Sequence, residues 1–300
     1  MAFDTVRVAA VQATSVVLDV DATIDKAIAL IGDAARDGVQ LVVFPECFVS
    51  VYPSGSWAAA AATWSREADA LWQRLWDSSV DVGGPQVGRL SKACGEYGVH
   101  IAIGVNERED DRPGTLYNSL LVIGPDGVLS RHRKLMPTMH ERVFHGVGAG
   151  DDLDVVALPN GARVAGLICW ENRMPLARWA LYKGGPQIWF APTADDSDEW
   201  IASMRHIAIE AGAFVVSAPQ YIPASAFPSD FPMPLPPDTP VFGRGGACII
   251  GPTGHVIAGP LYDQEGIVTA DCDLNDALRA KRYFDAVGHY GRADVLTPRD

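Results

Sequence analysis

Short apolar runs alternate with helical patterns along most of this chain, and this alternation restricts its possible folds more than any other feature. The first run, residues 6–12, is rich in β-branched side chains and has the length of a buried strand. Apolar residues at helical spacing follow from Asp21, and Gly38 suits the C-terminal cap of that helix. A second strand, residues 41–44, must end at Pro45, which has no backbone N–H for a sheet.

The same alternation continues to the C-terminus. Further helices are expected at 58–77, 85–97, 175–183, 199–211 and 274–283, and further strands at 100–105, 187–190, 214–217 and 267–273. Tight turns predict three hairpins, formed by 116–123 with the chain from 128, by 155–158 with 163–168, and by 248–250 with 255–258. Residues 136–152 lack a period and residues 223–240 contain seven prolines, so both segments should be loops.

Two stretches of sequence occur twice. The sequence VIGPDG at 122–127 matches IIGPTG at 249–254, and residues 38–45, ending in VVFP, resemble residues 185–192, ending in IWFAP. Either the chain reuses a turn sequence by chance, or two similar halves share one core. In both cases the alternation predicts two sheets with helices outside them, in a layered α/β fold. We treat residues 1–300 as one domain, with a C-terminal helix and tail at 274–300.

The charge balance excludes several classes of partner. The chain has 24 Lys and Arg against 37 Asp and Glu, giving a formal net charge of −13. A nucleic-acid partner or an anionic membrane surface would require a basic face. No apolar stretch approaches the ~18 residues of a membrane-spanning helix. The N-terminus lacks a basic region followed by an apolar run, so no signal peptide is expected.

The cysteines are not arranged as a disulfide framework. They are odd in number, spread along the chain, and form no CxxC pair of the kind found in zinc ribbons or thioredoxins. The five are Cys47, Cys94, Cys169, Cys248 and Cys272. We therefore expect free thiols and a cytoplasmic location.

Three chemically different polar residues each follow an expected strand: Glu46, Lys134 and Cys169. Ligands of layered α/β folds gather at the carboxyl ends of strands, so these residues could share one site. Cys169 is the most unusual, because the sequence CWEN leads directly to Pro175, which suits the first turn of a helix. Backbone N–H groups at such a turn favour a thiolate, so we expect the pKa of Cys169 to lie below its usual ~8.5.

The sequence resembles the nitrilase superfamily and, within it, the branch of true nitrilases. The motifs that carry the resemblance are VFPE at 43–46, HRKL at 132–135 with PT at 137–138, LICWEN at 167–172, SMRHIA at 203–208 and GHY at 288–290. They occur in the order of the family and cover nearly the whole chain. The resemblance implies an α-β-β-α four-layer sandwich, a catalytic triad of Glu46, Lys134 and Cys169, and assembly from homodimers, with the C-terminal segment in the oligomer contacts. A further family glutamate, seven residues after the lysine, corresponds to Glu141.

The implied activity is hydrolysis of an organic nitrile to a carboxylic acid and ammonia. Cys169 would attack the nitrile carbon to give a thioimidate, and Glu46 would act as general base. Lys134 would stabilise the developing negative charge, and Glu141 would orient Lys134 or the substrate. Water and a small nitrile are the expected partners, and the chemistry needs no metal or organic cofactor.

Four further residues are predicted to contact the substrate. They are Tyr52, Trp57, Trp170 and Glu171. The family usually continues from the position of Glu141 to a Trp-Gly pair and then Gly-Asp-Gly. Here residues 142–151 read RVFHGVGAGD, so the sequence does not predict which nitrile is accepted.

Several other activities have to be weighed. An amidase or carbamoylase, or a cyanide hydratase, would use the same triad, but the amide-cleaving branches usually have a residue other than tryptophan after the nucleophile. No histidine lies in a papain-like signature. HERVFH at 140–145 has one residue too many for a zinc HExxH, and the glycines of GVGAG at 146–150 follow no strand of a dinucleotide site. A non-catalytic scaffold would need none of the triad residues.

Overall fold

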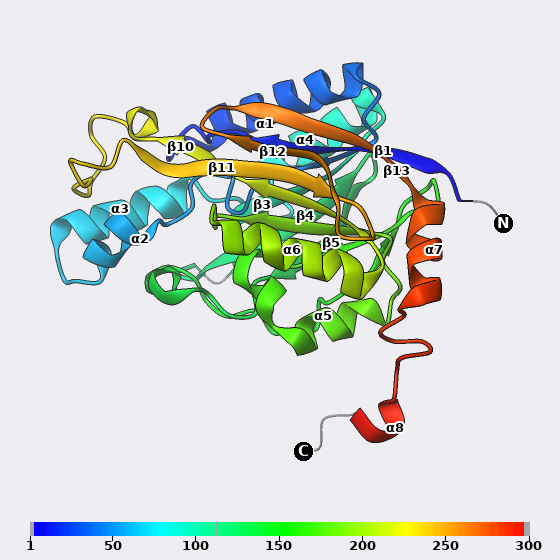
Figure 1. Cartoon of the computed structure of the whole chain (residues 1–300). Coiled ribbons are helices and arrows are strands. Elements are labelled where there is room, and N and C mark those ends of the chain that lie inside the picture. The colour runs from blue at the N-terminus through cyan, green and yellow to red at the C-terminus, as the bar shows by residue number, and fades with distance from the viewer. Residues whose placement is uncertain (1–2, 112, 297–300) are drawn as a thin grey trace.

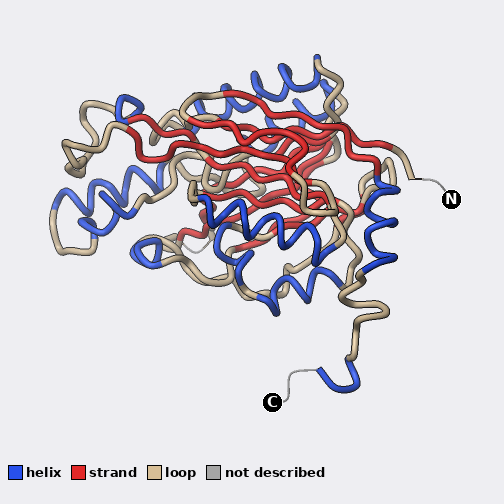
Figure 2. Tube along the Cα trace, in the orientation of Figure 1, coloured by secondary structure: helices blue, strands red, loops and turns tan. Residues whose placement is uncertain are grey.

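In the computed structural model, which describes residues 3–111 and 113–296, two β-sheets lie face to face and helices cover their outer sides (Figures 1 and 2). The first sheet contains β1 (Thr5–Gln12), β2 (Leu41–Val43), β3 (His100–Arg108), β4 (Leu116–Gly124), β5 (Gly127–Arg133) and β13 (Gly266–Asp273), in the order β13-β1-β2-β3-β4-β5. The second contains β6 (Val156–Ala157), β7 (Arg163–Gly166), β8 (Ile188–Thr193), β9 (Phe214–Pro219), β10 (Tyr221–Pro223), β11 (Val241–Ile250) and β12 (Val256–Tyr262). Its order is β10-β11-β9-β8-β7-β6, and β12 pairs with β11.

The helices differ in which sheet they cover. Those against the first sheet are α1 (Val20–Arg36) and α4 (Pro85–Tyr97), and those against the second are α5 (Pro175–Tyr182) and α6 (Asp198–Ala211). The remaining helices are α2 (Gly55–Ala58), α3 (Arg66–Asp77), α7 (Leu274–Tyr283) and α8 (Ala293–Leu296). The short 3₁₀ turns are η1 (Ala59–Ala61), η2 (Met139–Val143), η3 (Cys169–Arg173) and η4 (Ala224–Ala226). No helix in the described ranges is both long and apolar enough to cross a lipid bilayer.

The layers follow from the period-two pattern of the strands. In β1, Val8 and Ala10 face the second sheet, whereas Ala9 and Val11 pack with Ile24 of α1. In the second sheet, β8 repeats the pattern, with side chains alternating between the first sheet and α6. Strands buried on both faces are apolar throughout, which explains the continuous runs in the sequence.

The two halves of the chain fold in the same order, which explains the repeated sequences. Strands β1, β2 and β3 are mutually parallel and β4 and β5 follow antiparallel, while β7, β8 and β9 are parallel and β11 and β12 follow antiparallel. The sequence VIGPDG contains the turn from β4 to β5, and IIGPTG contains the turn from β11 to β12. Two similar halves therefore share the core between the sheets.

The structure departs from the expected elements mainly between residues 55 and 77. One helix was expected at 58–77, but the chain forms α2, η1 and α3 in succession. Helix α3 starts anew because the Ser65 side chain accepts a hydrogen bond from the backbone N–H of Ala68, at 3.1 Å. The expected C-terminal helix is α7, and residues 297–300 of the expected tail lie outside the described residues.

Candidate active site

Both sheets contribute to one buried cluster of charged and nucleophilic side chains. Glu46 follows β2, Lys134 follows β5 directly, and Cys169 is the first residue of η3, beyond the end of β7. All three side chains are buried. The structure thus brings together the three residues that the sequence placed after strands.

Lys134 lies between two carboxylates. Its Nζ donates to Glu46 Oε1 at 2.7 Å and to Glu141 Oε1 and Oε2 at 2.7 and 3.0 Å. Tyr52 Oη also donates to Glu141 Oε1, at 2.6 Å, and Asn118 Nδ2 donates to Glu46 Oε1, at 2.8 Å. The position of every charged group in this cluster is therefore fixed by at least two partners.

The charges in this cluster follow from burial and from Lys134. The two carboxylates raise the pKa of Lys134 well above its usual value, although burial opposes this. Burial would raise the pKa of Glu141, but the charge and hydrogen bonds of Lys134, together with His145 and the hydrogen bond from Tyr52, outweigh burial and lower it. Lys134 is thus a cation and Glu141 an anion at neutral pH.

Glu46 differs from Glu141 in both charge and contacts. Burial raises its pKa from 4.5 to about 7, although Lys134 acts in the opposite direction. Its Oε1 accepts the two bonds described above, whereas Oε2 has no hydrogen-bond partner among the described residues. A buried carboxyl with a pKa near neutrality and one free oxygen is suited to accept and return a proton.

Cys169 contradicts one expectation from the sequence. Burial, reinforced by the charge of Glu46, raises the pKa of its thiol from 9.0 to about 12. The expected lowering was wrong because η3 is a five-residue 3₁₀ turn and α5 begins only at Pro175, so no long helix has its N-terminus at the sulfur. The resting group is a thiol, held at 3.2 Å by a hydrogen bond from Thr193 Oγ1, and it needs a base before it can attack.

A cavity of about 530 Å³ opens beside the cysteine. Among the residues that line it are Tyr52, His140, Cys169, Trp170, Arg173 and Asp195. Trp170 Nε1 donates to Asp195 Oδ2 at 2.8 Å, and the Arg173 guanidinium lies 4.9 Å from the centre of the indole ring. Tyr52 and Trp170, two of the predicted contact residues, therefore lie where a substrate could reach Cys169.

Trp57 requires a correction. Its side chain is fully buried and packs edge-on against Phe144, Phe227 and Phe231, and it does not line the cavity. The large apolar ring is better accommodated in this aromatic cluster than at the cavity wall.

Glu171 also requires a correction. It is fully buried, and its carboxylate accepts hydrogen bonds from the backbone N–H groups of Leu135, at 2.5 Å, and Ile168, at 2.8 Å. The turn of η3 directs its side chain back between the sheets and away from the cavity that Cys169 lines. Its place in the sequence beside the nucleophile suggested a substrate contact that the backbone does not allow.

Besides the cavity residues His140, Arg173 and Asp195, two residues that hydrogen-bond to the catalytic groups were not identified from the sequence. Asn118 donates to both Glu46 and Glu141, and Thr193 donates to the Cys169 sulfur. Asn118 lies beside Ser119 in β4, before the apolar run 120–123, so the sequence offered only a weak signal for it, although the structure buries it. Thr193 ends β8 after the apolar residues 188–192, so it carried the same kind of signal as Cys169, a polar residue at the end of an apolar strand.

Comparison with known proteins gives consistent results. The model of the family described as carbon-nitrogen hydrolases matches residues 7–282. The chain is 45% identical to Nitrilase 3 of Arabidopsis thaliana over 300 residues, 97% of this chain and 86% of that protein. It is 43% identical to a bifunctional nitrilase/nitrile hydratase of Nicotiana tabacum over 304 residues, 98% of this chain and 85% of that protein.

The fold also matches solved structures. One is the crystal structure of Saccharomyces cerevisiae Nit3, a member of branch 10 of the nitrilase superfamily. It aligns with a TM-score of 0.74 over 96% of this chain and 97% of that chain, at 19% identity. The likeness at this identity concerns the fold, and it confirms the four-layer architecture predicted from the motifs.

Proposed function

The chain belongs to the carbon-nitrogen hydrolase family, and we propose that it is a nitrilase that converts an organic nitrile and two waters to a carboxylic acid and ammonia. The observation that carries this proposal is the free Oε2 of Glu46, buried in the same cluster as Lys134 and the Cys169 thiol. A thiol with a raised pKa needs such a base, and charge that develops on a substrate nitrogen needs such a cation.

The first half of the reaction forms the thioimidate. Glu46 takes the Cys169 proton as sulfur attacks the nitrile carbon, one C–N π bond breaks, and the electron pair moves to nitrogen. Lys134 stabilises this charge, and the proton on Glu46 is delivered to give a C=N–H group.

The second half releases the products. Glu46 removes a proton from water, which adds to the thioimidate carbon, and the resulting amine leaves as ammonia when the tetrahedral intermediate collapses to a thioester. A second water then cleaves the thioester, releasing the acid and restoring the thiol. Glu141 keeps Lys134 charged and in place throughout, since it holds Nζ with both oxygens.

One competing outcome is the amide. If the tetrahedral intermediate expels the cysteine sulfur instead of ammonia, the product is an amide, the product expected of the hydratase half of the bifunctional nitrilase/nitrile hydratase from Nicotiana tabacum. Protonated amines leave more readily than thiolates, so we propose the acid as the main product. An amidase or carbamoylase remains the second candidate because it would use the same three groups.

The test is product analysis on a panel of aliphatic, aromatic and arylacetonitriles with the matching amides in parallel. We expect ammonia and carboxylic acid from at least one nitrile class. Amide as the sole product would identify a hydratase, and turnover of amides alone would identify an amidase.

We further propose that the enzyme is a cytoplasmic homodimer or a higher homo-oligomer. An apolar groove of about 350 Å³ between α5 and the chain after α7 is lined by Leu176, Trp179, Phe284 and Tyr290, among others, and it suits a second copy. Free cysteines, all buried, fit a reducing compartment. Light scattering of the native chain and of a Leu176→Glu variant would test the assembly, and cell fractionation would test the location.

A further inference from the structure

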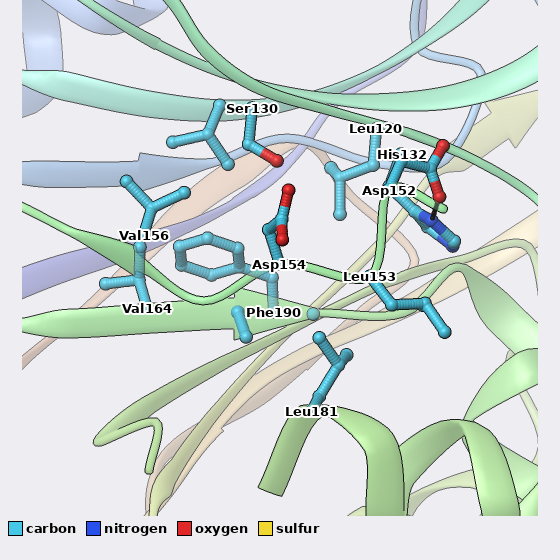
Figure 3. A pocket seen from close by; sticks show the side chains of 13 residues that line it. Leu120, Ser130, His132, Asp152, Leu153, Asp154, Val156, Val164, Leu181 and Phe190 are labelled. Atoms are coloured by element: carbon cyan, nitrogen blue, oxygen red, sulfur yellow. Dashed lines mark hydrogen bonds and ion pairs between the residues drawn. The ribbon is translucent and has the colours of Figure 1, made fainter. Parts of the chain in front are cut away.

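A second set of buried charges links the two motifs that contain Lys134 and Cys169. The His132 ring lies between two carboxylates, with Nδ1 2.8 Å from Asp152 Oδ1 and Nε2 3.1 Å from Glu171 Oε2. Figure 3 shows the contact between His132 and Asp152 beside a small cavity between the sheets. Because both ring nitrogens face carboxylates, both must carry hydrogens, so the ring is an imidazolium.

Glu171 joins backbone segments that belong to different sheets. Its Oε1 accepts from the N–H of Leu135, the residue after Lys134, and its Oε2 accepts from the N–H of Ile168, the residue before Cys169. Asp152 adds a third bond of this kind, accepting from the N–H of Arg133 at 2.8 Å. One ion cluster thus contacts the chain on both sides of Lys134 and immediately before Cys169.

The geometry points to Glu171 as a positioning residue, which holds Lys134 and Cys169 in register across the two sheets with the support of His132 and Asp152. This inference rests on the proposed function, since it concerns the spacing of the same cation and nucleophile. Glu171 does not touch the substrate cavity, so it acts only through the backbone segments that it ties together.

Glu171→Gln is the direct test because it keeps the size of the side chain and removes its charge. A neutral amide has one acceptor oxygen, so it cannot accept both backbone bonds and also pair with His132. Displacements of about 1 Å between reacting groups cost on the order of 10²-fold in rate. We expect kcat to fall about 10- to 100-fold while KM changes little, because the cavity is unaltered.

Glu107→Gln is the matched control. Glu107 is also almost fully buried, and its carboxylate accepts from Ser119, Arg131 and Arg133 side chains, but it contacts no residue of the loop that contains Cys169. This variant should lose stability to a similar extent without the loss of kcat. Equal falls of kcat in the two variants would overturn the inference.

The rate at which iodoacetamide alkylates Cys169 distinguishes a displaced Lys134 from a site that is only less tightly packed. This measurement does not depend on the substrate. If Lys134 is displaced from the sulfur, the thiolate loses its cation, so alkylation should slow and its pH profile should move to higher pH. A merely loosened site would expose Cys169 and speed alkylation, which would contradict the proposal even if kcat fell. The result holds whether or not nitriles prove to be the substrates.

Asp152→Asn keeps the inference testable if Glu171→Gln fails to fold. Asp152 is less buried and contacts His132 and the Arg133 N–H one step further from the nucleophile. Its variant should show a smaller fall in kcat, about 3- to 10-fold, with the same direction of shift in the alkylation profile. Unchanged kcat and an unchanged profile would overturn the role assigned to this cluster.

Discussion

The Lys134 ammonium lies 2.7 Å from Glu46 Oε1, and neither side chain is accessible to solvent. A buried pair of this kind cannot be separated without leaving an uncompensated charge in the interior. The same contact keeps the general base beside the cation that would stabilise the substrate anion. Catalysis and stability are therefore linked at this pair.

Lys134→Ala should reduce both activity and stability. The variant leaves Glu46 and Glu141 without their shared cation, which for a buried pair costs about 3–5 kcal/mol in the free energy of unfolding. Loss of the anion stabiliser should lower kcat about 10²–10³-fold. Urea unfolding and ammonia release measure the two effects. Activity close to that of the wild type in a folded variant would show that the cation is not needed.

The pH dependence of kcat/KM should follow the ionisation of Glu46. A base must be deprotonated in the free enzyme, and burial raises the pKa of Glu46 to about 7. We therefore expect kcat/KM to rise about tenfold per pH unit below about pH 7 and to level off above it. In Glu46→Gln, kcat/KM should no longer rise between acidic pH and pH 7, and the rate should fall about 10²–10⁴-fold. Glu107→Gln should retain the rise. Persistence of the rise in Glu46→Gln would assign it to another group.

The fold and the positions of the reactive groups were predictable because they depend on local patterns. Strand ends are set by residues such as Pro45, and polar side chains within a few residues of a strand's end lie at the carboxyl edge of the sheet. Helices α4 and α7 have the predicted bounds because each starts and ends with clear signals, such as Pro85 at the first turn of α4.

What could not be predicted depends on contacts between distant segments. The pKa of Cys169 is set by burial and by Glu46, which is remote in sequence, so the local turn gave the wrong direction. The Glu171 carboxylate accepts hydrogen bonds from the N–H groups of Ile168 and of Leu135, which is distant in sequence, and these bonds hold it between the sheets. The ring of Trp57 is enclosed by aromatic residues from segments far along the chain. Residue type and spacing contain no information about such partners.

Glu141→Gln should change the products as well as the rate. Its carboxylate holds Lys134 with two hydrogen bonds and keeps the ammonium charged, so the neutral variant weakens the supply of a proton to the leaving amine. Activity should fall, and the ratio of amide to acid should rise. The measurement is chromatography of the products formed from one good nitrile. A lower rate with an unchanged ratio of amide to acid would show that Glu141 does not influence whether the tetrahedral intermediate expels ammonia or the cysteine sulfur.

Trp170 and Trp57 should differ in what their substitution affects. Trp170→Ala enlarges the cavity that it lines, so the ratio of kcat/KM between large and small nitriles should change by about 10-fold or more. Trp57→Phe, the control, should cost about 1–3 kcal/mol in stability and leave this ratio unchanged. The substrate panel together with thermal unfolding separates the two. A change of selectivity in Trp57→Phe alone would restore Trp57 to the substrate site.

Intact-protein mass spectrometry after rapid acid quench tests the central claim most directly. During turnover of a nitrile, the wild-type chain should carry one added acyl or imidoyl group, and peptide mapping should place it on Cys169. Cys169→Ala should show neither adduct nor ammonia release. Cys94→Ala, which changes a buried cysteine of α4 that packs against the first sheet, should show both. Turnover by Cys169→Ala within tenfold of the wild type, or an adduct on another residue, would contradict the account.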